Sequence, residues 1–573
     1  MKRTQINLIV TLALAVLLAS CAGLDKMKKG SPDVKYTVTP EVLETHAGKV
    51  DVTIKVQIPE KYFDKKVVLE ATPVLVYEGG ETAFTPYRLQ GESIEGNDKV
   101  ISYLNGGSIT YTGSVPYNAN MRVSDLVVRI KATKGKNSVD FDPYKIANGV
   151  ISTSTLVADL GAAASTGLNQ FKRIIPETQV ADIYFLIQQA QLRDAELKKD
   201  EVKNLNAYIA AADVDAKKEV KGIVVSAYAS PDGGIDLNTK LAADREKVTK
   251  TYLDKEMKKA KIAPKAEGFF SLKSTPEDWD GFKKLMEASN IQDKELILRV
   301  LNMYSDPEVR EKEIKNMSQT FKVIAEEILP KLRRSKLIVN SELIGKSDDE
   351  LKGALAADAQ SLELEELLYV ATLETDVDAQ LKAYQTAAQK YPSCWRAENN
   401  VGVALYAKGD MNGAKAAFEK ANTIKANTPE VMNNLGVIAL RNGDYAKAKE
   451  YFGAAAGAGA ELDSNLGIIA IHEGDYEGAI RYFGNSTSCN AGLAKILAGK
   501  YDSALSTLNA NTQEVGFKYY LKAIVGARTA QNDMVIDNLK KSVALDAKYK
   551  AMAKTDLEFA KFFEDATFKS IVQ

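Results

Sequence analysis

A four-residue pattern returns at regular spacing near the C-terminal end of this 573-residue chain. A polar residue, an asparagine, an aliphatic residue and a glycine stand at 399–402, 433–436 and 464–467, first 34 and then 31 residues apart. Three further features keep the same register: a Gly-Asp pair at 409, 443 and 474, an alanine at 414, 448 and 479, and a phenylalanine at 418, 452 and 483. A period of this length predicts similar units that stack on one another and bury a shared core.

This register resembles the tetratricopeptide repeat, a helix-turn-helix unit of about 34 residues. The resemblance covers about residues 365–550, and it implies an all-α solenoid over 346–573 with a shortened fourth copy, a degenerate fifth copy and a C-terminal cap. In such a unit the glycine lets the neighbouring helix approach, the Gly-Asp pair makes a tight turn, and the phenylalanine fills space between helices.

Solenoids of this family bind extended or helical peptides on the face formed by the first helix of each repeat. The resemblance therefore implies an envelope protein partner, with a simple spacer as the alternative. By register the candidate partner groove contains Asn399, Val403, Tyr406, Asn433, Val437, Leu440, Arg441, Ile468, Ile471 and His472. We expect Asn400, Asn434 and Asn465 only to join one helix to the next.

The first residues of the chain predict where it is sent. Lys2 and Arg3 precede an apolar run at 6–18, which suits a signal peptide and is too short to span a bilayer. The run ends in Leu-Ala-Ser-Cys at 18–21, which resembles the lipobox of bacterial lipoproteins. The resemblance implies removal of residues 1–20, acyl chains such as palmitate on Cys21, and a polar lipidated tether over 21–34. An ordinary secretory signal is the alternative.

The residue after Cys21 is not the aspartate that retains many lipoproteins in the inner membrane. No strongly acidic cluster follows it, so the surface-export signal of some Bacteroidota lipoproteins is absent from this stretch. The resemblance therefore implies attachment to outer-membrane lipid on the side that faces the periplasm.

Composition argues against several kinds of partner and chemistry. With 75 basic and 76 acidic side chains the formal net charge is −1, so no overall field attracts nucleic acid. The two histidines, His46 and His472, stand in no metal-binding motif, and no GxSxG, Walker or CxxC motif occurs. We therefore expect no catalytic residues, no bound metal and no cofactor.

An N-terminal all-β sandwich is predicted over 35–134. Apolar and polar residues alternate at 50–58, which is the period of a half-buried strand. Gly-Gly pairs at 79–80 and 106–107 separate further stretches of this kind, as turns between strands do. Mixed Ser, Thr, Gly and Ala over 135–180 predict a linker with some strand content.

Strand-like and helix-like stretches alternate over 181–345, which predicts an α+β domain. The expected strands are 183–187, 222–228, 269–272 and 337–339, and the expected helices are 194–213 and 237–259, with a helical insertion at 277–334. The stretch 223–253 resembles the OmpA-like domains that bind peptidoglycan, in which a strand and a glycine-containing turn lead to Asn-x-x-Leu-x-x-x-Arg on a helix. Here Asn238, Leu241 and Arg245 occupy those positions.

In that family a carboxylate and the arginine bind diaminopimelate, a ligand with both ammonium and carboxylate groups. The position of the acid is Ser230 here, and Asp232 follows two residues later. The resemblance implies Ser230, Asp232, Asn238 and Arg245 as candidate peptidoglycan-binding residues. Two interpretations stay open: Asp232 replaces the missing acid, as in a Bacteroidota variant of the motif, or the domain has lost its ligand and these residues stabilise the turn and helix.

Together these features predict a multidomain, non-enzymatic envelope scaffold lipoprotein that binds a protein partner through its solenoid and contacts peptidoglycan through a modified OmpA-like site. A component of a secretion or envelope-assembly machine is the second hypothesis. A peptidoglycan-processing enzyme ranks last, because no carboxylate pair stands out.

Overall fold

The computed structural model describes residues 23–157, 161–262 and 267–573 and divides the chain into two compact units. The first unit contains the chain up to Leu168 together with Tyr391–Gln573, and the second contains Asn169–Lys390. The second unit is therefore an insertion, in sequence, between two parts of the first. The predicted signal peptide and Cys21 lie outside the described residues.

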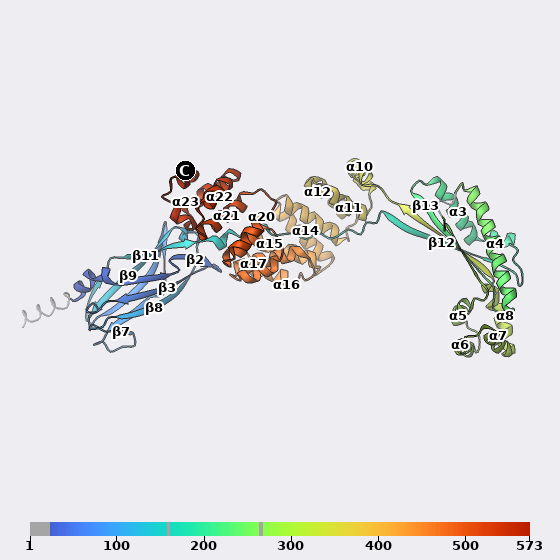
Figure 1. Cartoon of the computed structure of the whole chain (residues 1–573), viewed down its shortest axis with the longest axis horizontal. Coiled ribbons are helices and arrows are strands. Elements are labelled where there is room, and N and C mark those ends of the chain that lie inside the picture. Colours follow the sequence, from blue (N-terminus) through green and yellow to red (C-terminus); the bar gives the residue numbers. More distant parts are fainter. Residues whose placement is uncertain (1–22, 158–160, 263–266) are drawn as a thin grey trace, which may run out of the picture. The chain divides into compact units, whose positions relative to one another are not determined.

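The N-terminal part of the first unit is a β-sandwich (Figure 1). β3 (Lys49–Ile58) pairs with β1 (Lys35–Thr39), β2 (Val42–His46) and β8 (Gly107–Pro116). β9 (Ser124–Lys134) pairs with β4 (Val68–Tyr77), β10 (Asn137–Asp140) and β11 (Tyr144–Ile151). The remaining strands are β5 (Gly80–Ala83), β6 (Tyr87–Gly91) and β7 (Lys99–Ile101). Along β3 every second side chain is buried, as its period of two predicts.

The sandwich is larger at both ends than the sequence predicts. Leu24 and Met27 are buried in its core, so the residues after 22 are packed rather than a polar tether. Its buried apolar side chains, Leu24, Met27 and Val34, are few and stand among lysines and polar residues, which is why the composition predicts a tether. At the other end β10 and β11 extend the sheet to Ile151, within the stretch predicted to be a linker.

The second unit has a four-stranded sheet in the order β12-β15-β13-β14. The strands are β12 (Ile174–Tyr184), β13 (Lys218–Tyr228), β14 (Phe270–Thr275) and β15 (Arg334–Ile344). Helices α3 (Asp200–Val214) and α4 (Ile235–Lys259) lie together on one face of this sheet (Figure 1). The strand predicted at 183–187 is placed too late in the sequence, since β12 begins at Ile174. The first half of β12 is exposed and lacks an apolar pattern, so the sequence does not indicate a strand there.

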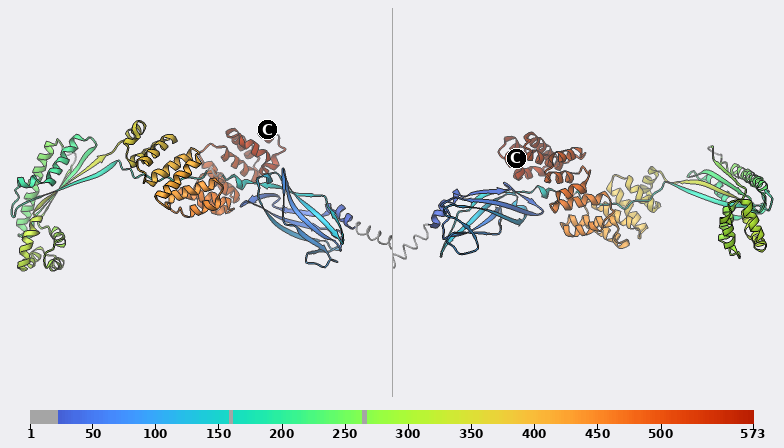
Figure 2. Two further views of the ribbon diagram at one scale, coloured as in Figure 1. Left: turned by 180° about the vertical axis from the view of Figure 1, so that it is seen from behind. Right: turned by 60° about the horizontal axis from the view of Figure 1, so that its bottom comes forward.

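Between β14 and β15 the chain forms a helical insertion with a hydrophobic cluster of its own. Its helices are α5 (Trp279–Glu287), α6 (Lys294–Met303), α7 (Pro307–Asn316), α8 (Ser318–Glu327) and α9 (Leu329–Leu332). Figure 2 shows these helices as a separate group at one end of the sheet. A short α2 (Asp194–Leu197) precedes α3, and α10 (Asp348–Asp358), α11 (Leu364–Leu373) and α12 (Val377–Lys390) complete the unit.

The C-terminal part of the first unit is a series of helix pairs around one continuous core. The pairs are α13 (Trp395–Ala407) with α14 (Met411–Ile424), α15 (Pro429–Arg441) with α16 (Tyr445–Gly453), α17 (Ala460–His472) with α18 (Tyr476–Phe483), α19 (Cys489–Leu497) with α20 (Tyr501–Ala510), and α21 (Gly516–Arg528) with α22 (Asn532–Leu545). α23 (Lys548–Thr555) and α24 (Ala566–Val572) pack on the last pair.

The recurring residues have the structural roles that their spacing predicts. Gly409, Gly443 and Gly474 end the first helix of each pair with a positive φ, between +76° and +84°, where a side chain would be strained. The aspartate that follows each of them accepts a hydrogen bond from a backbone N–H in the first turn of the next helix. Each Gly-Asp pair therefore ends one helix and starts the next.

The β-sandwich and the helix pairs of the first unit are joined by buried polar contacts. Arg528 on α21 donates to the carboxylates of Glu44 on β2 and Glu558, each at 2.6 Å. Burial lowers the pKa of Arg528 and the two carboxylates raise it, with a net shift upward, so this guanidinium stays charged. His46 and Tyr476 form another contact, at 2.6 Å between Nδ1 and the hydroxyl. These bonds join one edge of the sandwich to the third helix pair, through Tyr476, and to the last one, through Arg528.

A substitution at Gly436 should destabilise the helix pairs. A Cβ atom there, as at Gly402 and Gly467, would lie within 2.7 Å of the ring of the phenylalanine in its own repeat. Overpacking of this kind costs about 1–3 kcal/mol, so we expect Gly436→Ala to lower the urea midpoint. Trp395 fluorescence in a Trp279→Phe background would measure it. Gly453→Ala, where a Cβ meets nothing within 4 Å, is the matched control and should leave the midpoint unchanged or raised.

Candidate functional site

The first helices of the repeats hold a segment of the chain's own backbone. We call Gly161–Leu168 the groove segment; its sequence is GAAASTGL, and it lies in the stretch predicted to be a linker. It contacts α13, α15 and α17, which are more than 220 residues further along the chain. The groove predicted for a partner is therefore occupied by this chain itself.

Three asparagines bind alternate residues of the groove segment through paired hydrogen bonds. Asn465 accepts from the N–H of Ala163 at 2.8 Å and donates to its carbonyl at 2.9 Å. Asn434 makes the same pair with Ser165, at 2.6 and 2.8 Å, and Asn400 with Gly167, at 2.7 and 2.9 Å. A side-chain amide offers one acceptor and one donor edge, so it pairs with a peptide group as a neighbouring strand would.

The groove segment runs in the direction opposite to the order of the repeats. It advances by two residues for each repeat, from Ala163 on the third repeat to Gly167 on the first. Two residues is the period of extended backbone. Each repeat therefore binds one residue whose main chain faces the helices.

A second set of amides connects the first set across the repeats. Asn399 donates to the carbonyl of Ser165 at 3.0 Å, and Asn433 donates to the carbonyl of Ala163 and to the Ser165 hydroxyl, each at 3.0 Å. Asn434 donates to Asn399, and Asn465 to Asn433, at 2.8 Å. We call these five residues the asparagine ladder: Asn399, Asn400, Asn433, Asn434 and Asn465. Every member is at most 2% exposed, so the hydrogen bonds form away from water.

Close approach restricts which residues the groove segment can contain. A Cβ atom at Gly161 would lie 2.7 Å from Nδ2 of Asn490, and one at Gly167 would lie 2.9 Å from Cβ of Arg396. Ala162 and Ser165 are 5% and 2% exposed. The space available therefore requires glycine at 167 and small residues at the buried positions, whereas at Gly161 only the amide end of Asn490 would have to move.

The predicted partner-groove residues fall into three groups. Asn399, Asn433 and Tyr406 contact the groove segment, Tyr406 through a hydroxyl that donates to the carbonyl of Ala162 at 2.9 Å. Val437, Leu440, Ile468 and Ile471 are at most 1% exposed and belong to the core, and Val403 packs against it. Arg441 is half-buried, and the ring of His472 lies 4.1 Å from that of Tyr445.

Asn400, Asn434 and Asn465 do more than join one helix to the next, which is the only role that the sequence predicts for them. Two of them do bond to an asparagine of the preceding repeat, but all three also hold the groove segment. The available signal was the recurring asparagine itself, since a buried amide on a helix needs partners for both edges. Nothing in the local sequence indicates that those partners lie more than 220 residues away.

Asn434→Ala should release the groove segment from the ladder. The substitution leaves the N–H and C=O of buried Ser165 with fewer partners and removes the bond to Asn399. Because an unpaired buried polar group costs about 1–3 kcal/mol, we expect amide exchange at residues 161–168 to accelerate at least tenfold in mass-spectrometric hydrogen exchange. Asn412→Ala, at an exposed position on α14, should leave this exchange unchanged.

The second candidate site lies in the second unit, at the turn between β13 and α4. Arg245 on α4 is 0% exposed, and its guanidinium donates to the carbonyls of Leu186, Gln189 and Tyr228 at 3.2, 3.0 and 2.7 Å. Burial and nearby Arg333 lower the pKa of Arg245 to about 10, and Asp232 opposes the shift. In this structure the guanidinium binds three stretches of main chain together.

The other three residues predicted to bind peptidoglycan belong to a hydrogen-bonded group that includes Arg333, a residue outside the sequence motif. Asp232 forms an ion pair with Arg333 at 3.0 Å, and both side chains are at most 15% exposed. Ser230 donates to the same carboxylate and accepts from Arg333 at 3.1 Å, while Asn238 donates to the carbonyls of Ser230 and Gly233. Each charged or amide group already has a partner within the chain. Binding of diaminopimelate by these residues stays a prediction, and it requires Asp232 to exchange Arg333 for the ligand.

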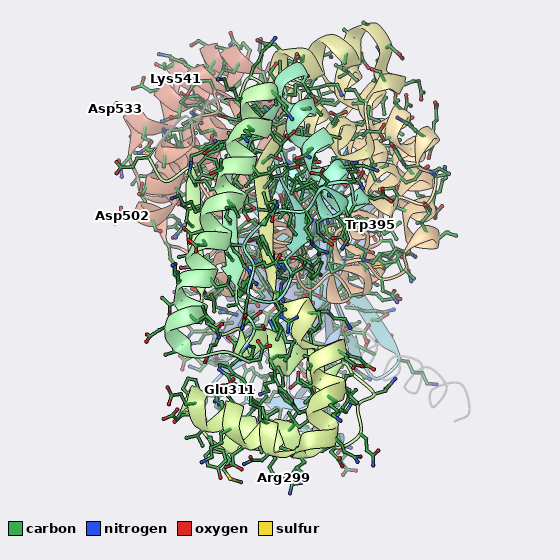
Figure 3. All side chains as sticks on the ribbon, turned by 90° about the vertical axis from the view of Figure 1, so that its right-hand side faces the viewer. Arg299, Glu311, Trp395, Asp502, Asp533 and Lys541 are labelled. Atoms are coloured by element: carbon green, nitrogen blue, oxygen red, sulfur yellow. The ribbon has the colours of Figure 1, made fainter. Side chains whose placement is uncertain are left out.

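Arg245→Ala should destabilise the second unit, since it removes the donor that joins the carbonyls of Leu186, Gln189 and Tyr228 and leaves a cavity where a fully buried side chain stood. We expect a loss of about 3 kcal/mol or more from the free energy of unfolding. Urea unfolding followed by Trp279 fluorescence in a Trp395→Phe background would measure it. Arg299→Ala is the control: Figure 3 shows this exposed side chain at the outer edge of the helical insertion, and an equal loss for both variants would contradict the assignment.

Other sites are sparse in the described parts of the chain. Residues 23–157, 161–262 and 267–573 contain no cluster of three or more histidine, cysteine or acidic side chains placed to hold a metal. Within the same ranges, every helix is too short or too polar to cross a membrane. A mainly apolar pocket of about 450 Å³ is lined by Phe483, Cys489 and Tyr549 and by Gly161 at the start of the groove segment.

Comparisons with known proteins identify the helical repeats. The family model described as tetratricopeptide repeat matches residues 376–429 and 433–486. The chain is also 32% identical over 91 residues to the anaphase-promoting complex subunit CDC16 of Saccharomyces cerevisiae. That match spans 16% of this chain and 11% of the yeast protein, so it concerns a small part of both.

Two solved structures of other proteins are also similar to part of this chain. A tetratricopeptide repeat protein from Parabacteroides merdae is 13% identical, covering 37% of this chain and 91% of its own, with a TM-score of 0.28. PilF of Pseudomonas aeruginosa is 14% identical, covering 39% and 98%, with a TM-score of 0.26. Both TM-scores are below 0.5, so the repeats are assigned from the family model alone. The chain has C-terminal tetratricopeptide repeats, and repeats of this kind support binding to a protein partner.

Proposed function

We propose that the chain is a non-enzymatic scaffold of the bacterial envelope that binds a protein partner through its tetratricopeptide repeats. The observation that supports this most directly is the asparagine ladder, which binds an extended polypeptide through main-chain hydrogen bonds. A surface built to pair with peptide groups suits protein recognition and offers no nucleophile or acid–base pair. Participation in a secretion or envelope-assembly machine is the more specific form of the same proposal.

Crosslinking in cells would test partner binding. A photo-reactive amino acid at Tyr445 or Tyr482, which are exposed on the repeats, should crosslink to the same envelope protein. The matched control position is Val100, which is 50% exposed on the β-sandwich. Recovery of one partner from both repeat positions and not from Val100 supports the proposal, whereas identical products from all three positions contradict it.

Attachment through Cys21 is part of this proposal and has its own test. Acyl chains gain about 0.8 kcal/mol for each buried CH₂ group, and two or more chains anchor a protein stably. Cys21→Ser should therefore move the protein from the outer-membrane fraction to the periplasmic fraction. Unchanged membrane fractionation of this variant would contradict lipid attachment at Cys21.

Contact with peptidoglycan is proposed as a separate interaction of the second unit. If Asp232 binds the ammonium of the peptide stem, Asp232→Asn should reduce cosedimentation of the purified protein with cell-wall sacculi several-fold. Asp244→Asn, an exposed carboxylate on the helix that follows this turn, is the control. Equal sedimentation of both variants and the wild type would contradict a role for Asp232 in wall binding, and release of muropeptides would instead support an enzyme.

A further inference from the structure

The groove segment has the contacts expected of a ligand rather than of a connecting loop. Its main chain is bound at Ala163, Ser165 and Gly167 by side chains, and none of these bonds depends on the identity of the bound residue's own side chain. Recognition of this kind accepts other extended segments, provided that they fit the space. That space excludes a Cβ at the position of Gly167, where it would meet Cβ and Cα of Arg396, and leaves room only for small side chains at Ala162 and Ser165.

The residues that flank the groove segment are anchored on both sides. On its N-terminal side, the hydroxyl of Ser154 donates to the carbonyl of Thr45 at 2.7 Å. On its C-terminal side, the carbonyl of Leu168 accepts from Arg396 at 2.9 Å, and the ring of Phe171 stacks on that of Tyr369 at 4.4 Å. The segment can therefore leave the ladder while the chain on either side of it stays in place.

We propose that Gly161–Leu168 is an internal ligand that closes the asparagine ladder, and that the external ligand of this site is an extended segment with glycine at the position of Gly167 and alanine or serine at the buried positions before it. The proposal rests on the proposed function, since it names the class of peptide that the repeats bind. A covalently linked ligand acts at an effective concentration on the order of 1 mM. A free segment at lower concentration binds only when the internal one is displaced.

The test uses the full chain and a fluorescent peptide with the sequence GAAASTGL. Two release variants are compared with wild type: Gly167→Val, which places a side chain against Arg396, and Ser165→Pro, which removes the N–H bound by Asn434. Thr166→Val, at an exposed position of the same segment, is the matched control. Anisotropy titrations should show at least tenfold tighter binding to the release variants than to wild type or Thr166→Val.

Two further controls tie binding to the ladder. Adding Asn400→Ala and Asn434→Ala to a release variant should abolish the gain, and a peptide with valine in place of both glycines should not bind. If release variants with wild-type circular dichroism bind the peptide no better than wild type, the segment is only part of the fold and the proposal is overturned.

If the release variants fail to fold, hydrogen exchange on the wild-type protein still tests whether the groove segment can leave the ladder. Amides of Ala163, Ser165 and Gly167 should exchange through a local opening, at least tenfold faster than core amides of α15. Exchange at the rate of global unfolding would overturn the proposal. Failure of the cellular crosslink alone contradicts the proposed function and leaves these peptide results unaffected.

Discussion

The pairing of buried main-chain groups determines how the first unit is assembled. An extended segment that lies against helices has no neighbouring strand, yet its N–H and C=O groups must find partners once water is removed. Asparagines on successive repeats supply one donor and one acceptor for every second residue. This requirement connects features that look independent in the sequence: the recurring Asn before each aliphatic-glycine pair, the small residues of the groove segment, and the return of the chain to the repeats after the second unit.

Because the groove segment is bound to the asparagine ladder, the predicted partner groove is not an open surface. Several residues assigned to it by register contact the groove segment, and others are buried in the core of the repeats. A partner therefore meets either the exposed parts of the repeats or a site that already contains a segment of this chain. The buried ion pair of Arg528 with Glu44 and Glu558 holds the sandwich against the last repeats.

In the second unit, the sequence motif predicts that Arg245 binds a ligand, whereas the structure shows its guanidinium bound to the chain's own carbonyls. The motif Asn-x-x-Leu-x-x-x-Arg is present, and its arginine lies at the expected turn. Its guanidinium is enclosed and bound to three carbonyls, and Asp232 is paired with Arg333. Arrangements of this kind stabilise a turn whether or not a ligand binds nearby, since residues that position a site also hold the fold.

The sequence by itself determined the features that depend on neighbours along the chain. The helix pairs follow from a repeat whose Gly-Asp turn, alanine and phenylalanine act within one unit, and the sandwich strands follow from alternation at 50–58. Only the tertiary structure decided what fills the groove, that Leu24 and Met27 join the sandwich core, and that Arg333 is the partner of Asp232. Those contacts join residues from about 40 to more than 200 positions apart, or depend on one or two side chains in a polar stretch, and no local period or composition specifies them.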